Sequence, residues 1–210
     1  MSDDPTVTKP RGGLFTWALW GAALLGVAAV VYIILQATGK PAVEVATEVP
    51  AAQRKVEGVS AKWTKAEAPQ PLDYAFYDAA GKPVRIADLK GKVVVLNIWA
   101  TWCAPCVAEM PTLAKLQAAY KDKPVEVAAV SIDSVESGTK AKLFIAKHDP
   151  LEFYHDREGK LPFQLKPPAM GAPTTVVFGP DGLERGRVSG EADWSAPDAK
   201  ALIDQVLAGG

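Results

Sequence analysis

Residues 92–111 read KVVVLNIWATWCAPCVAEMP and contain the only two cysteines of the 210-residue chain. The apolar run Val93–Trp99 follows Gly91 and shows no regular polar alternation, which predicts a strand buried on both faces of a sheet. Residues 104–121 then place apolar side chains at helical spacing. The stretch therefore predicts a strand that leads through Cys103 directly into a helix.

Residues 71–210 show the pattern of one α/β domain in which strands and helices alternate. The other elements expected are a hairpin over 74–86, a buried strand over 125–132, a helix over 139–148, a hairpin over 174–189 and a last helix capped by Ser195 and running to Leu207. This order predicts a small α/β sandwich.

A second apolar segment, Leu14–Leu35, has 22 residues without a charge. At about 1.5 Å rise per residue, it is long enough for the roughly 30 Å hydrocarbon core of a bilayer. Lys9 and Arg11 precede it, so residues 1–13 are expected in the cytoplasm and the rest of the chain outside. We expect a single-pass transmembrane signal anchor over 14–35. A cleaved signal peptide is the alternative, although its apolar region usually has only about 7–15 residues.

Between this segment and the domain, residues 36–70 are rich in Ala, Val, Glu, Lys and Pro and have little periodicity. They are interpreted as a flexible periplasmic linker, with a weak strand near Val59–Trp63 left open.

Composition excludes two classes of function. The formal net charge is −1 and no basic arm is present, which argues against nucleic acid as a partner. A structural zinc site needs four ligands, and beyond the cysteines the chain offers only His148 and His155, whose spacing does not suit zinc. Both histidines are interpreted as surface or loop residues, and no metal or other cofactor is expected.

The cysteine pair is better suited to redox chemistry than to a structural disulfide. A bridge across so short a loop removes little entropy from the unfolded chain. Cys103 is expected at a helix N-terminus, where N–H groups and the helix dipole stabilise a thiolate, and Cys106 lies one turn further on, where it can attack a mixed disulfide. The intervening Ala104 and Pro105 add no charge, which favours a weak oxidant and hence a reductant.

Glu109 lies one helical turn after Cys106. Its carboxylate could raise a thiol pKa or relay a proton, and a solvated helix glutamate is the alternative.

These motifs resemble those of a known family. WCAPC after a buried strand, with Gly171–Thr174 before another, resembles the thioredoxin superfamily. WCxPCxxEMP and the preceding ADLKGK at 87–92 look like the TlpA/ResA/CcmG group of exported reductases, and the tail over 189–203 is most similar to the TlpA branch. Over residues 70–208 the resemblance implies a thioredoxin-like three-layer sandwich with a central mixed sheet and an N-terminal β-hairpin extension.

The resemblance also implies roles for individual residues in a thiol:disulfide oxidoreductase. Cys103 would be the nucleophile, Cys106 the resolving thiol and Pro173 a cis-proline that faces their redox-active disulfide. The side chains expected to bind the substrate chain are those of Trp102, Ala104, Pro105 and Ala172. Asn97 stands where thioredoxin has a buried acid, so the proton of Cys106 needs another acceptor, for which Glu109 is the candidate.

The implied partners are disulfide-containing periplasmic proteins and a membrane electron donor of the DsbD/CcdA type. The expected role is reduction of cysteines for copper-centre assembly of cytochrome oxidase, at the periplasmic face of a bacterial inner membrane. The alternatives are apocytochrome c thioreduction in cytochrome c maturation and a Cu(I)-carrying chaperone without turnover. A peroxiredoxin is excluded because Ala100 and Leu96 stand where that active site needs Thr or Ser and Pro.

Overall fold

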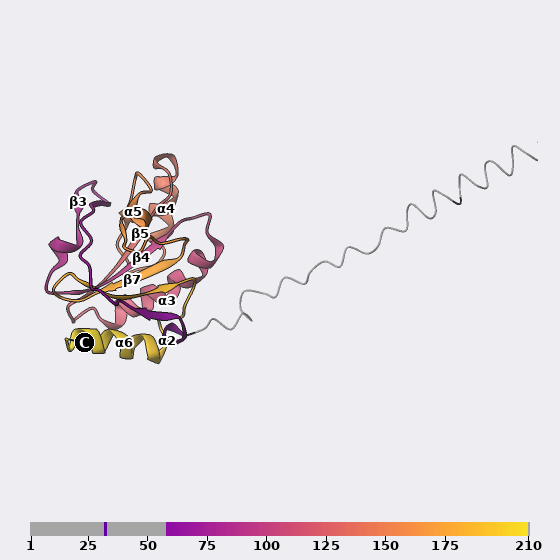
Figure 1. The fold of residues 1–210 in the computed structure, drawn as a ribbon. Coiled ribbons are helices and arrows are strands. Elements are labelled where there is room, and N and C mark those ends of the chain that lie inside the picture. Colours follow the sequence, from indigo (N-terminus) through magenta and orange to yellow (C-terminus); the bar gives the residue numbers. More distant parts are fainter. Residues whose placement is uncertain (1–31, 33–57, 210) are drawn as a thin grey trace, which may run out of the picture. The chain divides into compact units, whose positions relative to one another are not determined.

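The computed structural model describes Tyr32 and residues 58–209 (Figure 1). Residues 58–209 belong to one compact unit. The predicted cytoplasmic segment 1–13 lies outside the described residues, and so does the predicted anchor over 14–35 apart from Tyr32. Among the helices that the structure describes, none combines the length and apolar character needed to cross a bilayer.

One mixed sheet organises the described part of the chain, in the strand order β1-β8-β7-β4-β5-β6-β2-β3. The strands are β1 Trp63–Lys65, β2 Phe76–Asp78, β3 Pro83–Val84, β4 Val93–Trp99, β5 Val125–Ser131, β6 Tyr154–His155, β7 Thr174–Phe178 and β8 Glu184–Ser189. The β4 strand pairs in parallel with β5 and antiparallel with β7. The predicted central mixed sheet is therefore confirmed.

All seven residues of β4 are buried, as the apolar run predicts. Side chains alternate along a strand, so Val93, Val95 and Trp99 enter one core cluster while the even-numbered side chains enter another. Asn97 occupies an odd position and lies on the same face as Trp99. The odd-numbered position therefore decides toward which face of the sheet the Asn97 side chain points.

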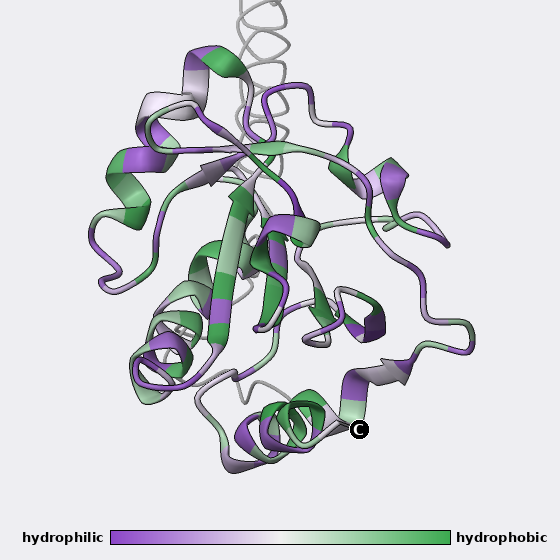
Figure 2. Ribbon diagram, turned by 90° about the vertical axis from the view of Figure 1, so that its left-hand side faces the viewer, coloured by the Kyte–Doolittle hydropathy of each residue, from purple (hydrophilic) through white to green (hydrophobic). Residues whose placement is uncertain are grey.

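Helices cover the face of the odd-numbered positions. The helices on this face are α3 Ala104–Ala119, α4 Gly138–Ile145 and α6 Pro197–Leu207. The opposite face is covered by the segment that holds the 3-10 helix Ile86–Leu89 and by α5 Leu161–Gln164. In Figure 2 the central strands are mostly hydrophobic, whereas the helices carry both hydrophobic and hydrophilic residues. The arrangement is the three-layer sandwich that was predicted.

Both predicted hairpins are confirmed by antiparallel pairing of β2 with β3 and of β7 with β8. Gly81 and Gly182 lie in the two turns with φ of +82° each, a conformation that glycine adopts without steric cost. The hairpin of β2 and β3 lies at one edge of the sheet, next to β6.

The prediction of a flexible linker over 36–70 is wrong for its last part. Residues Val59–Lys62 form the short helix α2, and Trp63–Lys65 form β1, which pairs with β8 at the other edge of the sheet. Val59 is fully buried in the core of the helical face. These seven residues are of mixed polarity and include too few apolar side chains to show a helical or strand period in the sequence. Their structure therefore depends on pairing with a distant part of the domain.

The predicted cap of the last helix is also wrong. Ala196 occupies the N-cap position, and Pro197 is the first residue of α6. The Ser195 hydroxyl donates instead to Asp193 Oδ1 at 2.6 Å. The cap prediction failed because a nearer carboxylate engages the hydroxyl within the preceding turn.

Candidate active site

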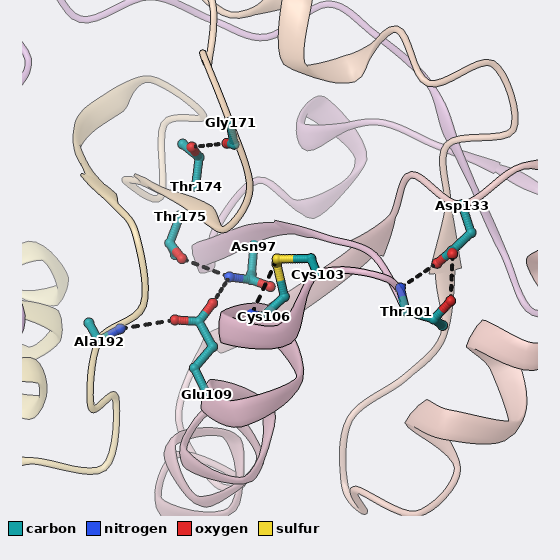
Figure 3. Close-up of a disulfide and its surroundings, with 10 residues drawn as sticks. All are labelled: Asn97, Thr101, Cys103, Cys106, Glu109, Asp133, Gly171, Thr174, Thr175 and Ala192. Atoms are coloured by element: carbon teal, nitrogen blue, oxygen red, sulfur yellow. Dashed lines mark hydrogen bonds between the residues drawn. A yellow bond between two sulfur atoms is a disulfide. The ribbon is translucent and has the colours of Figure 1, made fainter. Parts of the chain in front are cut away.

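The two cysteines form a disulfide at the start of α3, with their Cα atoms 5.3 Å apart (Figure 3). Cys103 is the N-cap of the helix, and its sulfur accepts a hydrogen bond from the Cys106 backbone N–H at 3.3 Å. Cys103 is 6% exposed and Cys106 is fully buried. Of the two sulfurs, that of Cys103 is therefore the one that a partner can approach.

Three local features at Cys103 favour its thiolate once the disulfide is reduced. The Cys106 N–H already points at its sulfur, and the positive end of the α3 dipole lies at this position. The first turn of the helix contains no acidic residue, and Pro105 fits there without loss of a helical hydrogen bond. The N–H group and the helix dipole therefore stabilise negative charge on the Cys103 sulfur once the disulfide is reduced.

Glu109 extends from the next turn of α3 and is only 2% exposed. Its Oε1 accepts a hydrogen bond from Asn97 Nδ2 at 2.7 Å, and its Oε2 accepts one from the Ala192 N–H at 3.0 Å. Burial raises the pKa of this carboxyl to about 7, against the lowering effect of the two hydrogen bonds. The group thus exchanges a proton near neutral pH, and it is not a solvated helix glutamate.

Asn97 links three elements around this carboxyl. Its odd position on β4 turns the side chain toward α3, where it reaches Glu109 (Figure 3). The same Nδ2 donates to Thr175 Oγ1 at 2.8 Å, and Thr175 is its direct register partner on β7. The amide thus orients Glu109 without adding a negative charge.

Pro173 lies directly before β7, and the Ala172–Pro173 peptide bond is cis. The Pro173 carbonyl accepts a hydrogen bond from the Gly190 N–H at 2.8 Å, and Thr174 Oγ1 donates to the Gly171 carbonyl at 2.7 Å. The first bond holds the loop before β7 against the loop after β8, and the second closes the turn that leads into β7.

An apolar groove of about 230 Å³ includes Trp102 and Ala172 in its lining, together with Phe163 and Met170. The exposed fractions of Trp102, Phe163 and Met170 are 68%, 70% and 95%. Large apolar side chains exposed next to one another mark an interaction surface.

Of the predicted substrate-binding residues, the structure brings Trp102 and Ala172 together in this groove. Ala104 and Pro105 lie in the first turn of α3, directly after Cys103, where Ala104 is exposed and Pro105 is half-buried. Their roles in binding stay predictions.

A buried carboxylate that was not predicted from the sequence holds the loop before Cys103. Asp133 is 1% exposed and accepts hydrogen bonds from the Thr101 N–H at 2.9 Å and from Thr101 Oγ1 at 2.7 Å (Figure 3). It also accepts one from Ser131 Oγ at 2.8 Å. The sequence did contain a sign of this contact, because Asp133 comes directly after a predicted buried strand. Side chains at the adjacent carboxyl ends of parallel strands lie close together.

The prediction that His155 lies at the surface or in a loop is wrong. It is 6% exposed on β6, and its Nε2 lies 2.9 Å from the Asp133 carbonyl oxygen, so it is not a surface or loop residue. His148 is half-buried near the end of α4 and approaches the Phe144 carbonyl.

A model of the Redoxin family matches residues 45–203, more than half of the chain. The chain belongs to the Redoxin family. This Redoxin chain is 44% identical over 100 residues to the thiol-disulfide oxidoreductase ResA of Oceanobacillus iheyensis, an alignment that covers 47% of the chain and 50% of that ResA. It is 36% identical over 119 residues to the thioredoxin-like protein YneN of Bacillus subtilis, covering 56% of the chain and 68% of YneN.

A solved structure gives the same fold. It is a Chlorobium tepidum protein assigned as the thiol:disulfide interchange protein DsbE, with a TM-score of 0.53 and 28% sequence identity over 70% of the Redoxin chain and 96% of that protein. These relatives confirm the thioredoxin-like fold and the resemblance to the TlpA/ResA/CcmG group. The Redoxin chain spans about half the length of the ResA relative that it matches.

Proposed function

We propose that this chain is a thiol–disulfide oxidoreductase that reduces disulfides in partner proteins. The observation that carries this function is the disulfide at the N-terminus of α3, in which Cys103 is slightly exposed and Cys106 is fully buried. Similarity to a ResA named as a thiol-disulfide oxidoreductase supports the same class of reaction.

The reaction begins with both cysteines reduced. The Cys103 thiolate, stabilised by the Cys106 N–H and the helix dipole, attacks one sulfur of the partner's disulfide. A new S–S bond forms between Cys103 and the partner, and the partner's own S–S bond breaks. The partner sulfur that leaves as a thiolate takes a proton from solvent.

The second step resolves this mixed disulfide. The Cys106 thiol gives its proton to the Glu109 carboxylate, three residues along the same helix face, and attacks the Cys103 sulfur. The second partner thiolate leaves and takes a proton, and the chain ends with its own disulfide. The two cysteines have then given two electrons to the partner, which has also gained two protons.

The direction of electron flow follows from the residues between the cysteines. Ala104 and Pro105 bring no charge that would stabilise the reduced form further, which favours a reductant over a strong oxidant. A membrane-bound dithiol donor of the DsbD/CcdA type would restore the reduced pair.

The proposed location is the periplasmic face of a bacterial inner membrane, with residues 14–35 as anchor. The 22 uncharged residues of this segment and the basic residues before it support that topology. In an oxidising compartment, cysteines that must bind a metal or haem need a reductant. The proposed partners are therefore copper-centre assembly proteins of cytochrome oxidase or apocytochrome c.

Trapping of the mixed disulfide tests the function. With Cys106→Ser the second step is blocked, so the full chain should accumulate on a partner through Cys103, as a species that disappears on reduction with dithiothreitol. Mass spectrometry of that species identifies the partner, and a copper-site protein or an apocytochrome c would decide between the two roles. Recovery of cytosolic proteins alone would contradict the proposed location.

Two controls sharpen this experiment. Cys103→Ser should trap nothing, because the remaining Cys106 is fully buried. Equal trapping by both variants would contradict the assignment of Cys103 as nucleophile. A reduced chain that binds Cu(I) tightly and one to one, yet reduces no protein disulfide, would instead favour the copper-carrier function.

A further inference from the structure

One peptide group connects Glu109 to a residue far away in the sequence. The Ala192 N–H donates to Glu109 Oε2 at 3.0 Å, and this bond is buried. The carbonyl of the same peptide unit belongs to Glu191 and accepts a hydrogen bond from Lys62 Nζ at 2.6 Å. Because a peptide unit is planar and conjugated, its oxygen and its N–H respond to each other electronically.

The Lys62 side chain comes from a segment that is fixed on this loop. Lys62 is the last residue of α2, and Trp63 pairs with Val188 on β8 directly after it. On the other side, Gly58 forms a bridge with Asp193, and the Ser60 N–H donates to Asp198 Oδ2 at 2.9 Å. Contacts on both sides of Lys62 therefore place its ammonium at the Glu191 carbonyl.

A cation on a carbonyl oxygen polarises the peptide and makes its N–H a stronger donor. A stronger donor at Oε2 stabilises the ionised carboxylate more than the neutral acid. Burial of Glu109 and repulsion from the Glu191 carboxylate both raise the pKa of Glu109. A cation on the Glu191 carbonyl acts in the opposite direction.

The other groups around Glu109 add no fixed charge. Asn97 on β4 is a neutral donor, and Thr175 on β7 reaches the carboxyl only through Asn97. On α3 itself the titratable groups nearby are Cys103 and Cys106, which are joined in the oxidised protein. In that state the Glu191 carboxylate is a charged side chain that raises the pKa of Glu109, and Lys62 is the cation bonded to the carbonyl of the same residue.

We propose that Lys62 is a positioning residue for Glu109, and that its ammonium, acting through the Glu191–Ala192 peptide, favours the ionised carboxylate that takes the proton of Cys106. This inference rests on the proposed function for the use of that carboxylate, but the coupling itself does not depend on turnover. It also gives a role to a part of the chain that sequence composition assigned to a linker.

The test is a titration of the oxidised full chain in detergent, with ¹³C-labelled glutamate carboxyls and Glu109 assigned through Glu109→Gln. Lys62→Met retains the apolar stem and removes the charge, so the Glu109 midpoint should rise by about half a pH unit. Lys62→Arg retains a cationic donor and should restore the midpoint. Lys65→Met is the matched control, since Lys65 is an exposed lysine three residues further along the same segment.

An unchanged Glu109 midpoint in Lys62→Met would overturn the proposal, and so would an equal rise in Lys65→Met or in Lys62→Arg. If Lys62→Met does not fold, Lys62→Gln provides a polar, uncharged substitute for the same titration. Activity is measured separately from pH 5 to pH 9. A shifted midpoint together with full activity of Glu109→Gln would uphold the coupling and reject the proton-accepting role of Glu109.

Discussion

At the scale of single residues, Glu109 shows how burial prepares a group for proton transfer. A carboxyl on an exposed helix face would be ionised at neutral pH and a weak proton acceptor. Enclosed between β4 and the loop after β8, the Glu109 carboxyl has a pKa raised to about 7. Its two protonation states are then close in free energy, which suits the exchange of a proton with a buried thiol such as Cys106.

The raised pKa predicts a pH-dependent stability. In the folded protein Glu109 binds a proton up to about pH 7, whereas the unfolded chain releases it near the ordinary value of 4.5. The native state therefore binds more protons between these values, and the free energy of unfolding should fall as pH rises through this window, by about 3 kcal/mol from this group. Glu109→Gln should remove this slope, measured by urea unfolding of the oxidised protein from pH 4.5 to pH 8.

Glu158→Gln is the control for this prediction, since that side chain is 55% exposed and forms an ion pair with Lys160 at the surface. Its pH profile should follow the wild type. Parallel profiles for wild type and Glu109→Gln would show that burial does not raise the pKa of Glu109.

At the scale of elements, the sequence predicts the parts that are long and periodic. The β4 strand and α3 follow from a seven-residue apolar run and from helical spacing, and both hairpins follow from glycine turns between apolar segments. By contrast, α2 and β1 together have only seven residues, and their order depends on β8. Pairing with a distant strand leaves no periodic signal in so short a segment.

The residues of the candidate site also fall into those that the sequence predicts and those that it does not. The two cysteines and Glu109 could be predicted because they lie at helical spacing within one motif. Thr175 and the Ala192 peptide could not. Thr175 contacts Asn97, and the Ala192 N–H contacts Glu109, only once β7 and the loop after β8 pack in the folded domain. Residues that act through their backbone have no side-chain signature in a sequence.

The edge strand β1 leads to a prediction of its own. A Cβ added at Gly186 on β8 would lie 2.5 Å from the Thr64 carbonyl oxygen and 2.5 Å from the Trp63 ring. Gly186→Ala should therefore displace β1 and lower the free energy of unfolding by about 1–3 kcal/mol, measured by urea unfolding. At Gly171 a Cβ would meet nothing within 4 Å, so Gly171→Ala should change stability by less than about 0.5 kcal/mol. Equal effects of the two substitutions would contradict this packing of β1.

At the scale of the whole molecule, one sheet brings three segments that are distant in the sequence together around the candidate site. The segments are the loop and first turn over 100–106, the loop over 171–173 before β7 and the loop over 190–193 after β8. Separate apolar clusters on the two faces of the sheet fix these loops relative to one another. The groove beside Trp102 then offers a partner chain an apolar surface next to Cys103.

If this arrangement makes the Cys103–Cys106 pair a reductant, its reduction potential must lie well below that of a strong dithiol oxidant. The full chain is equilibrated at pH 7 with glutathione buffers of known ratio, and the oxidised fraction is read by thiol alkylation and mass spectrometry. We expect a potential more negative than about −180 mV, toward that of thioredoxin at about −270 mV. A potential near −120 mV, that of a strong dithiol oxidant, would contradict it.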